Sequence, residues 1–113
     1  PLLLATQCNE DDNGIACTEE AKAGLNITIK DAETNLYLSE GVSVIATDGS
    51  YSEALICLDV VEPIFSGAYE REGNYIITVS KSGYVTYTSE IITVTSDVCH
   101  VIPQQITILL QPE

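Results

Sequence analysis

The chain has 113 residues, the length of one ordinary domain, and 45% of them are hydrophobic, which is enough for a single core. Acidic residues number 17 against 4 basic ones, which gives a formal net charge of −13 at pH 7. So few basic side chains cannot neutralise a run of phosphates or be drawn to anionic lipid. We therefore expect no nucleic-acid partner and no polybasic attachment to a membrane.

The N-terminal segment, residues 1–23, is interpreted as a leader and an acidic linker, with the folded domain expected over residues 24–113. Its opening, PLLLA, resembles the apolar part of a signal peptide and is too short for a membrane-spanning helix. Cys8 follows this apolar stretch and precedes a strongly acidic one. From its surroundings alone, Cys8 is a candidate for a disulfide, for a reactive thiol or for covalent attachment.

A calcium-loop pattern overlaps the same segment. The stretch NEDDNGIACTEE matches an EF-hand loop at most positions, with Asn9, Asp11, Asn13 and Glu20 as its candidate ligands. The first position is usually aspartate, and the flanking segments are too short for the two helices that orient such a loop. We therefore interpret the stretch as an acidic spacer and predict neither a metal nor another cofactor.

Alternation of apolar and polar residues dominates the chain from residue 25 onward. Leu25 and Ile27 begin the first such run, and this period of two is typical of half-buried strands. Turn-forming pairs such as DG at 48–49 and SG at 82–83 separate the runs. The pattern predicts an all-β protein, a seven-stranded antiparallel Greek-key β-sandwich. The expected strands cover residues 25–30, 42–47, 51–60, 75–80, 84–88, 90–95 and 105–111.

Arg71, the only arginine, lies between two glutamates and two residues after Tyr69. A guanidinium can donate two parallel hydrogen bonds to a carboxylate or sulfate of a ligand, and an exposed tyrosine can stack on a sugar. The simpler interpretation, which we favour, is that Arg71 pairs with a neighbouring acid and orders the turn that leads to Tyr75.

His100, the only histidine, follows Cys99 and lies three residues after Asp97. A small hydrolase would need this histidine to face a hydroxyl and an acid within hydrogen-bond reach. The nucleophile-elbow pattern G-x-S-x-G is absent, so we expect His100 to make local hydrogen bonds and expect no enzymatic activity. The candidate ligand-binding residues are Tyr69, Glu70, Arg71 and His100.

Two segments resemble a known domain family. The run GNYIITVSKSGY at 73–84 looks like a hairpin of carboxypeptidase regulatory-like domains, which share the transthyretin-type (prealbumin-like) sandwich. The run ITIKDAETNLYLSEGVSVIA at 27–46 is similar to the first hairpin of that family, although Asn35 stands where the family usually has glycine. The resemblance implies the same sandwich fold.

A closer similarity is to small bacterial lipoproteins of unknown function that carry such a domain. They typically have CT before the first strand, AYER-x-G-x-Y in the middle and CHV before the last strand, as at 17–18, 68–75 and 99–101 here. In addition, LLLATQC resembles the lipobox of lipoproteins from Bacteroidetes. The resemblance implies lipid attachment at Cys8, a location at the bacterial outer membrane, facing either the periplasm or the exterior, and an envelope protein or a glycan as partner.

The remaining cysteines suit an exported protein. Cys17 precedes the first expected strand and Cys99 precedes the last, and terminal strands of a sandwich can lie side by side, so a Cys17–Cys99 disulfide is geometrically reasonable. Two unlinked thiols are the alternative, and Cys57 is expected to pack as a small hydrophobic residue. The expected function is a lipid-anchored envelope module with a structural or interaction role. A surface that binds a glycan, a peptide or calcium is the alternative, and a small hydrolase that uses His100 is a third.

Overall fold

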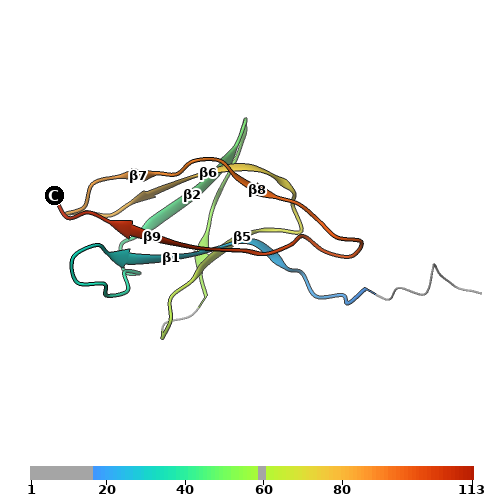
Figure 1. Cartoon of the computed structure of the whole chain (residues 1–113), viewed down its shortest axis with the longest axis horizontal. Coiled ribbons are helices and arrows are strands. Elements are labelled where there is room, and N and C mark those ends of the chain that lie inside the picture. The colour runs from blue at the N-terminus through green and yellow to red at the C-terminus, as the bar shows by residue number, and fades with distance from the viewer. Residues whose placement is uncertain (1–16, 59–60) are drawn as a thin grey trace, which may run out of the picture.

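The computed structural model describes residues 17–58 and 61–113, and within them the chain forms nine strands and no helix (Figure 1). One sheet has the order β4-β5-β1-β9 and consists of β1 (Ala23–Asp31), β4 (Ile56–Cys57), β5 (Phe65–Tyr69) and β9 (Gln104–Leu110). The other has the order β3-β2-β6-β7 and consists of β2 (Ser43–Asp48), β3 (Tyr51–Ala54), β6 (Gly73–Ser80) and β7 (Tyr87–Thr88). The strand β8 (Ile92–Val94) also pairs with β6. The all-β prediction is confirmed.

The two sheets lie one above the other, as in a β-sandwich, and the apolar core fills the space between them (Figure 1). Along β1 the side chains of Leu25, Ile27 and Ile29 are fully buried, whereas the intervening Asn26 and Thr28 are only half-buried. Burial of each such aliphatic side chain contributes about 1.5–3 kcal/mol to folding. The other strands supply the rest of the core, which includes Val44, Ala46, Tyr75, Ile77, Val79, Val94, Ile108 and Leu110.

The first and last strands lie side by side, and they are parallel. β1 pairs with β9 from Leu25–Gln104 to Asp31–Leu110, while β1 pairs antiparallel with β5 on its other side. The expectation of an entirely antiparallel sandwich is therefore wrong for this pair. The parallel arrangement has a consequence for the site, because the segments that lead into β1 and into β9 must arrive at the same end of the molecule.

The strand count also differs from the expected seven in the part of the chain that the structure describes. Residues 51–60 were expected to form a single strand, but the chain changes sheets at the buried Leu55: β3 pairs with β2 in one sheet and β4 pairs with β5 in the other. β5 itself was not expected, because four of its five residues are buried and no polar alternation marks it. The sequence thus indicates strand over residues 51–60, but no residue pattern within this range indicates that the chain changes sheets.

The loop after β1 is organised around the buried Asp31. One carboxylate oxygen accepts hydrogen bonds from the N–H groups of Glu33 and Thr34 (2.7 and 2.9 Å), and the other accepts one from the Tyr84 hydroxyl (2.6 Å). Asn35 adopts a left-handed backbone with φ of 63°, which asparagine tolerates better than most residues. This local network connects the β1 loop to the segment between β6 and β7.

No helix in the described ranges is both long and apolar enough to cross a lipid bilayer.

Candidate functional site

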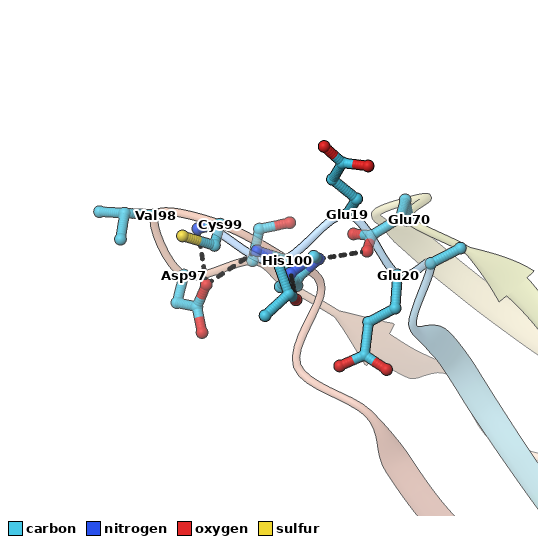
Figure 2. A pocket seen from close by; sticks show the side chains of 10 residues that line it. Glu19, Glu20, Glu70, Asp97, Val98, Cys99 and His100 are labelled. Atoms are coloured by element: carbon cyan, nitrogen blue, oxygen red, sulfur yellow. Dashed lines mark hydrogen bonds and ion pairs between the residues drawn. The ribbon is translucent and has the colours of Figure 1, made fainter. Parts of the chain in front are cut away.

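Three segments meet at the end of the sandwich where β1 begins: the segment before β1, the turn after β5 and the loop between β8 and β9 (Figure 2). Together they line an open hollow of about 570 Å³, called here the Cys99 hollow. Its lining residues are Thr18, Glu19, Glu20, Ala21, Glu70, Ser96, Asp97, Val98, Cys99 and His100.

A disulfide between Cys17 and Cys99 joins two of these segments, as the sequence suggested. Their Cα atoms are 5.2 Å apart, and 82 positions separate them in the chain. The bond is possible because the parallel β1 and β9 begin at the same end of one sheet. It therefore fixes the entry to both strands at once.

The turn after β5 brings Glu70 to the same place through an unusual backbone. Ala68 and Glu70 both lie in the left-handed region, with φ of 54° and 51°. For residues other than glycine such conformations cost of order 1–3 kcal/mol each and persist only where surrounding contacts hold them. The main-chain N–H of Glu70 donates to the carbonyl of Lys22 at 3.0 Å, and this bond is one of those contacts.

The Glu70 carboxylate supplies the others. One oxygen accepts a hydrogen bond from the Lys22 main-chain N–H at 3.0 Å and lies 2.5 Å from Nδ1 of His100. The other accepts from the main-chain N–H of Val101 at 3.0 Å. These contacts hold the pKa of Glu70 below its ordinary value despite the opposing effect of burial, and the hydrogen bond from Val101 is the largest cause. Glu70 is thus an ionised acceptor that joins all three segments.

Asp97 shapes the loop that carries His100. Its carboxylate accepts hydrogen bonds from the main-chain N–H groups of His100 and Cys99, at 2.9 and 2.8 Å. The same two bonds, with that from His100 the larger cause, lower the pKa of Asp97. Figure 2 shows His100 held between this turn and Glu70.

The second nitrogen of the His100 ring faces a hydroxyl. Nε2 lies 2.9 Å from Oγ1 of Thr18, the residue that follows the disulfide half Cys17. His100 therefore contacts a hydroxyl on one side and an acid on the other, and its side chain is 13% exposed. This is the arrangement that the hydrolase hypothesis required of it.

Arg71 points to a different part of the molecule. Its Nη1 atom donates to Asp48 at 3.0 Å and to the Tyr75 hydroxyl at 2.9 Å, and the guanidinium stacks on the Tyr51 ring, 3.6 Å from its centroid. The arginine thus pairs with Asp48 rather than with its sequence neighbours, Glu70 or Glu72. It ties the turn before β6 to the β2–β3 hairpin.

The other aromatic candidate, Tyr69, is 46% exposed at the end of β5. Tyr51, Tyr75 and Tyr84 are engaged in internal contacts with Glu53, Arg71 and Asp31, respectively. The exposed tyrosines belong to separate places in the chain, which are Tyr37, Tyr69 and Tyr87. None of the three lines the Cys99 hollow.

The structure therefore brings two of the four candidate ligand-binding residues together, Glu70 and His100, and separates Arg71 from them. Sequence reasoning did not pair Thr18 with His100. The signal that could have revealed this contact is their position: each directly follows one half of the expected disulfide.

The calcium-loop hypothesis falls mostly outside the described residues, as does the attachment hypothesis for Cys8; Asn9, Asp11 and Asn13 are not described. Glu20 is described and pairs with Lys22 at 3.0 Å, and this bond is the main cause of its lowered pKa. Across residues 17–58 and 61–113, no group of three or more histidine, cysteine or acidic side chains is placed to hold a metal ion.

Comparison of the chain with protein-family models yields no match, and comparison with curated proteins yields none either.

Proposed function

We propose that this protein is a lipid-anchored module of the bacterial cell envelope, with a structural or interaction role, attached through Cys8. The observation that carries the proposal is the Cys17–Cys99 disulfide. Disulfides persist in oxidising compartments and are rare in the cytosol, so this bond supports an exported location. It also lies at the start of the described domain, where it would hold the sandwich firmly to an N-terminal tether.

Within this proposal the domain is a transthyretin-type sandwich of the carboxypeptidase regulatory-like kind, with Greek-key connections. Two local features support the resemblance. Asn35, which stands where that family usually has glycine, has a left-handed backbone, as a glycine position would require. Tyr84, the last residue of the second matching segment, donates a hydrogen bond to Asp31 of the first.

The test of the anchor is the intact mass of the native protein extracted from membranes. We expect a chain that begins at Cys8 and carries acyl groups. A Cys8→Ser variant should leave the membrane fraction, whereas the matched Cys57→Ser variant should remain in it. A soluble wild-type product that retains residues 1–7 would contradict the anchor.

An interaction role is tested by capture of partners from the native envelope with the anchored protein. An envelope protein or glycan that co-purifies with the chain supports the role, provided that the same capture from cells that lack the chain does not recover it. If crosslinking captures no partner, the interaction role is contradicted and a purely structural module is the better description.

A further inference from the structure

The hydrogen bonds around His100 determine where its proton lies. The ionised Glu70 carboxylate can only accept, and it already takes two main-chain N–H groups, so Nδ1 of His100 must be the donor to it. In the neutral imidazole the other nitrogen, Nε2, then carries a lone pair. The Thr18 hydroxyl, 2.9 Å away, must donate to that lone pair. Its oxygen is left electron-rich and open to attack an electrophile.

We propose that Thr18, His100 and Glu70 form a proton relay that makes the Thr18 hydroxyl a nucleophile for acyl transfer from small esters. Thr18 is the nucleophile, His100 the general base, and Glu70 the residue that positions the imidazole. The proposal goes beyond the module role and departs from the sequence-based expectation of no catalysis. It rests on the contacts of these three side chains and is independent of the anchor.

The surroundings allow a substrate to reach the hydroxyl. Thr18 is exposed and lines the Cys99 hollow together with both other members of the relay. The segment from Thr18 to Glu20 lies outside every strand, so its N–H groups are not paired in a sheet. The proposal takes these groups as the donors to the developing oxyanion. The carboxylates of Glu19 and Glu20 border the hollow as well. Esters of neutral or cationic alcohols are therefore favoured over those that carry a carboxylate.

The reaction balances without a cofactor. The Thr18 oxygen forms a bond to the ester carbonyl carbon while its proton passes to Nε2 of His100. The tetrahedral intermediate collapses, the bond from carbon to the alcohol oxygen breaks, and His100 returns the proton to the departing alcohol. Water then attacks the acyl-threonine in the same way, which releases a carboxylic acid and restores the hydroxyl.

The disulfide supplies the preorganisation that such a relay needs. Thr18 follows Cys17 and His100 follows Cys99, so the one covalent bond holds the nucleophile beside the base. Asp97 fixes the main chain of His100 from the other side. The relay should therefore exist only in the oxidised protein, and reduction provides a control that changes no residue.

The experiment treats the oxidised full chain with p-nitrophenyl acetate and follows acetylation by intact mass and peptide mapping. We expect one acetyl group on Thr18, retained in Thr18→Ser and lost in Thr18→Val. The Thr107→Val variant, at an exposed threonine of β9, should be labelled like wild type. His100→Gln should slow labelling about 100-fold, the usual size of a general-base effect. The proposal would be overturned if Thr18 were acetylated no faster than Thr107. It would also be overturned if Thr18 were acetylated at the same rate in His100→Gln as in wild type.

The positioning role of Glu70 has its own readout. Acetylation should accelerate as pH rises, because only the neutral imidazole can take the proton. In Glu70→Gln the carboxylate that accepts from Nδ1 of His100 is gone, so the pH profile of acetylation should change its shape as well as reach a smaller maximum. A uniform loss at every pH, with no movement of the curve, would mean that Glu70 only supports the loop. Mass confirmation of the disulfide shows that each variant is oxidised, and a circular dichroism spectrum like that of wild type shows that it is folded.

Substrate preference completes the test. An acetate ester with a quaternary ammonium group should react at least about tenfold faster than one with a carboxylate at low salt, and the difference should shrink as salt is added. Equal rates for the two esters would contradict a role for the acids around the hollow.

Discussion

At the scale of single residues, Glu70 joins more segments of the chain than is usual for a partly exposed side chain. Its side chain is 34% exposed, yet its carboxylate accepts hydrogen bonds from main-chain groups on both sides of the disulfide. It also occupies a left-handed backbone that few residues adopt willingly. Strain of this kind is kept where surrounding contacts require it, and here it aims an acid at the only histidine.

Tyr75 gives the first prediction at this scale. Its fully buried hydroxyl donates to the carbonyl of Arg71 and accepts from the guanidinium of the same residue, each at 2.9 Å. Tyr75→Phe removes both bonds and should lower the free energy of unfolding by about 1–3 kcal/mol. Tyr87→Phe, at a 37% exposed tyrosine, should change it by less than about 0.5 kcal/mol. Urea titration of both variants measures the difference, and equal costs would refute the role of the buried hydroxyl.

Asp31 gives a prediction about pH. The Tyr84 hydroxyl, and after it the N–H groups of Thr34 and Glu33, hold the pKa of Asp31 below its ordinary value of 3.8. A folded-state pKa below that of the unfolded chain gives stability that is present above the unfolded value and is lost as the pH falls through the folded one. The free energy of unfolding should therefore fall between about pH 5 and pH 2.

The matched variants for this prediction are Asp31→Asn and Glu33→Gln, the second of which removes an exposed neighbouring charge. Asp31→Asn should be less stable near neutral pH and show a flatter decline in acid, whereas Glu33→Gln should follow wild type. An unchanged acid slope in Asp31→Asn would show that the decline arises from other carboxylates.

At the scale of strands, the sequence was informative where one side of a strand is buried. β1, β2, β6 and β9 all show the expected alternation, and their bounds lie within about two residues of the expected ranges. β5 has no such alternation because four of its five consecutive residues are buried. The change of sheet at Leu55 is a tertiary event, and no local pattern encodes it.

Gly67 in the middle of β5 makes the crowding there testable. A Cβ atom at this position would collide with the buried side chain of Leu55 and approach Oε2 of Glu53 to 2.6 Å. Gly67→Ala should therefore lower the free energy of unfolding by about 1–3 kcal/mol, the usual cost of overpacking. The φ of Gly67 is ordinary, so the effect is steric rather than conformational.

A double-mutant cycle isolates that collision. In a Leu55→Ala background the space opposite Gly67 is open, so the additional cost of Gly67→Ala should fall below its cost in wild type. Leu55→Ala alone should cost about 2–5 kcal/mol through the cavity that it leaves. Strictly additive costs would mean that Leu55 is not the obstacle, and Glu53→Ala would then be the next background to examine.

At the scale of the whole molecule, the candidate site depends on contacts that join distant parts of the chain. The sequence singled out Glu70 and His100 separately, but they are 30 positions apart, and Thr18 and His100 are 82 apart. Only the disulfide hypothesis connected the two ends beforehand. Because each directly follows one half of that disulfide, the threonine and the histidine could be placed together from the sequence once the disulfide is assumed.

The same disulfide should dominate the global stability of the domain. It closes a loop of 82 residues, and chain-entropy arguments assign to such a bond about 4.5 kcal/mol through restriction of the unfolded chain. The Cys17→Ser/Cys99→Ser variant should lose a large part of that free energy. Its urea dependence should also steepen, because an unfolded chain without the crosslink exposes more surface.

Wild type in reductant should match the variant, and the variant should be insensitive to reductant. If the variant and the oxidised wild type unfold at the same urea concentration, the disulfide does not dominate the stability. The hydrogen bonds of Glu70 would then hold the starts of β1 and β9 together. In that case Glu70→Ala should destabilise the variant far more than it destabilises wild type.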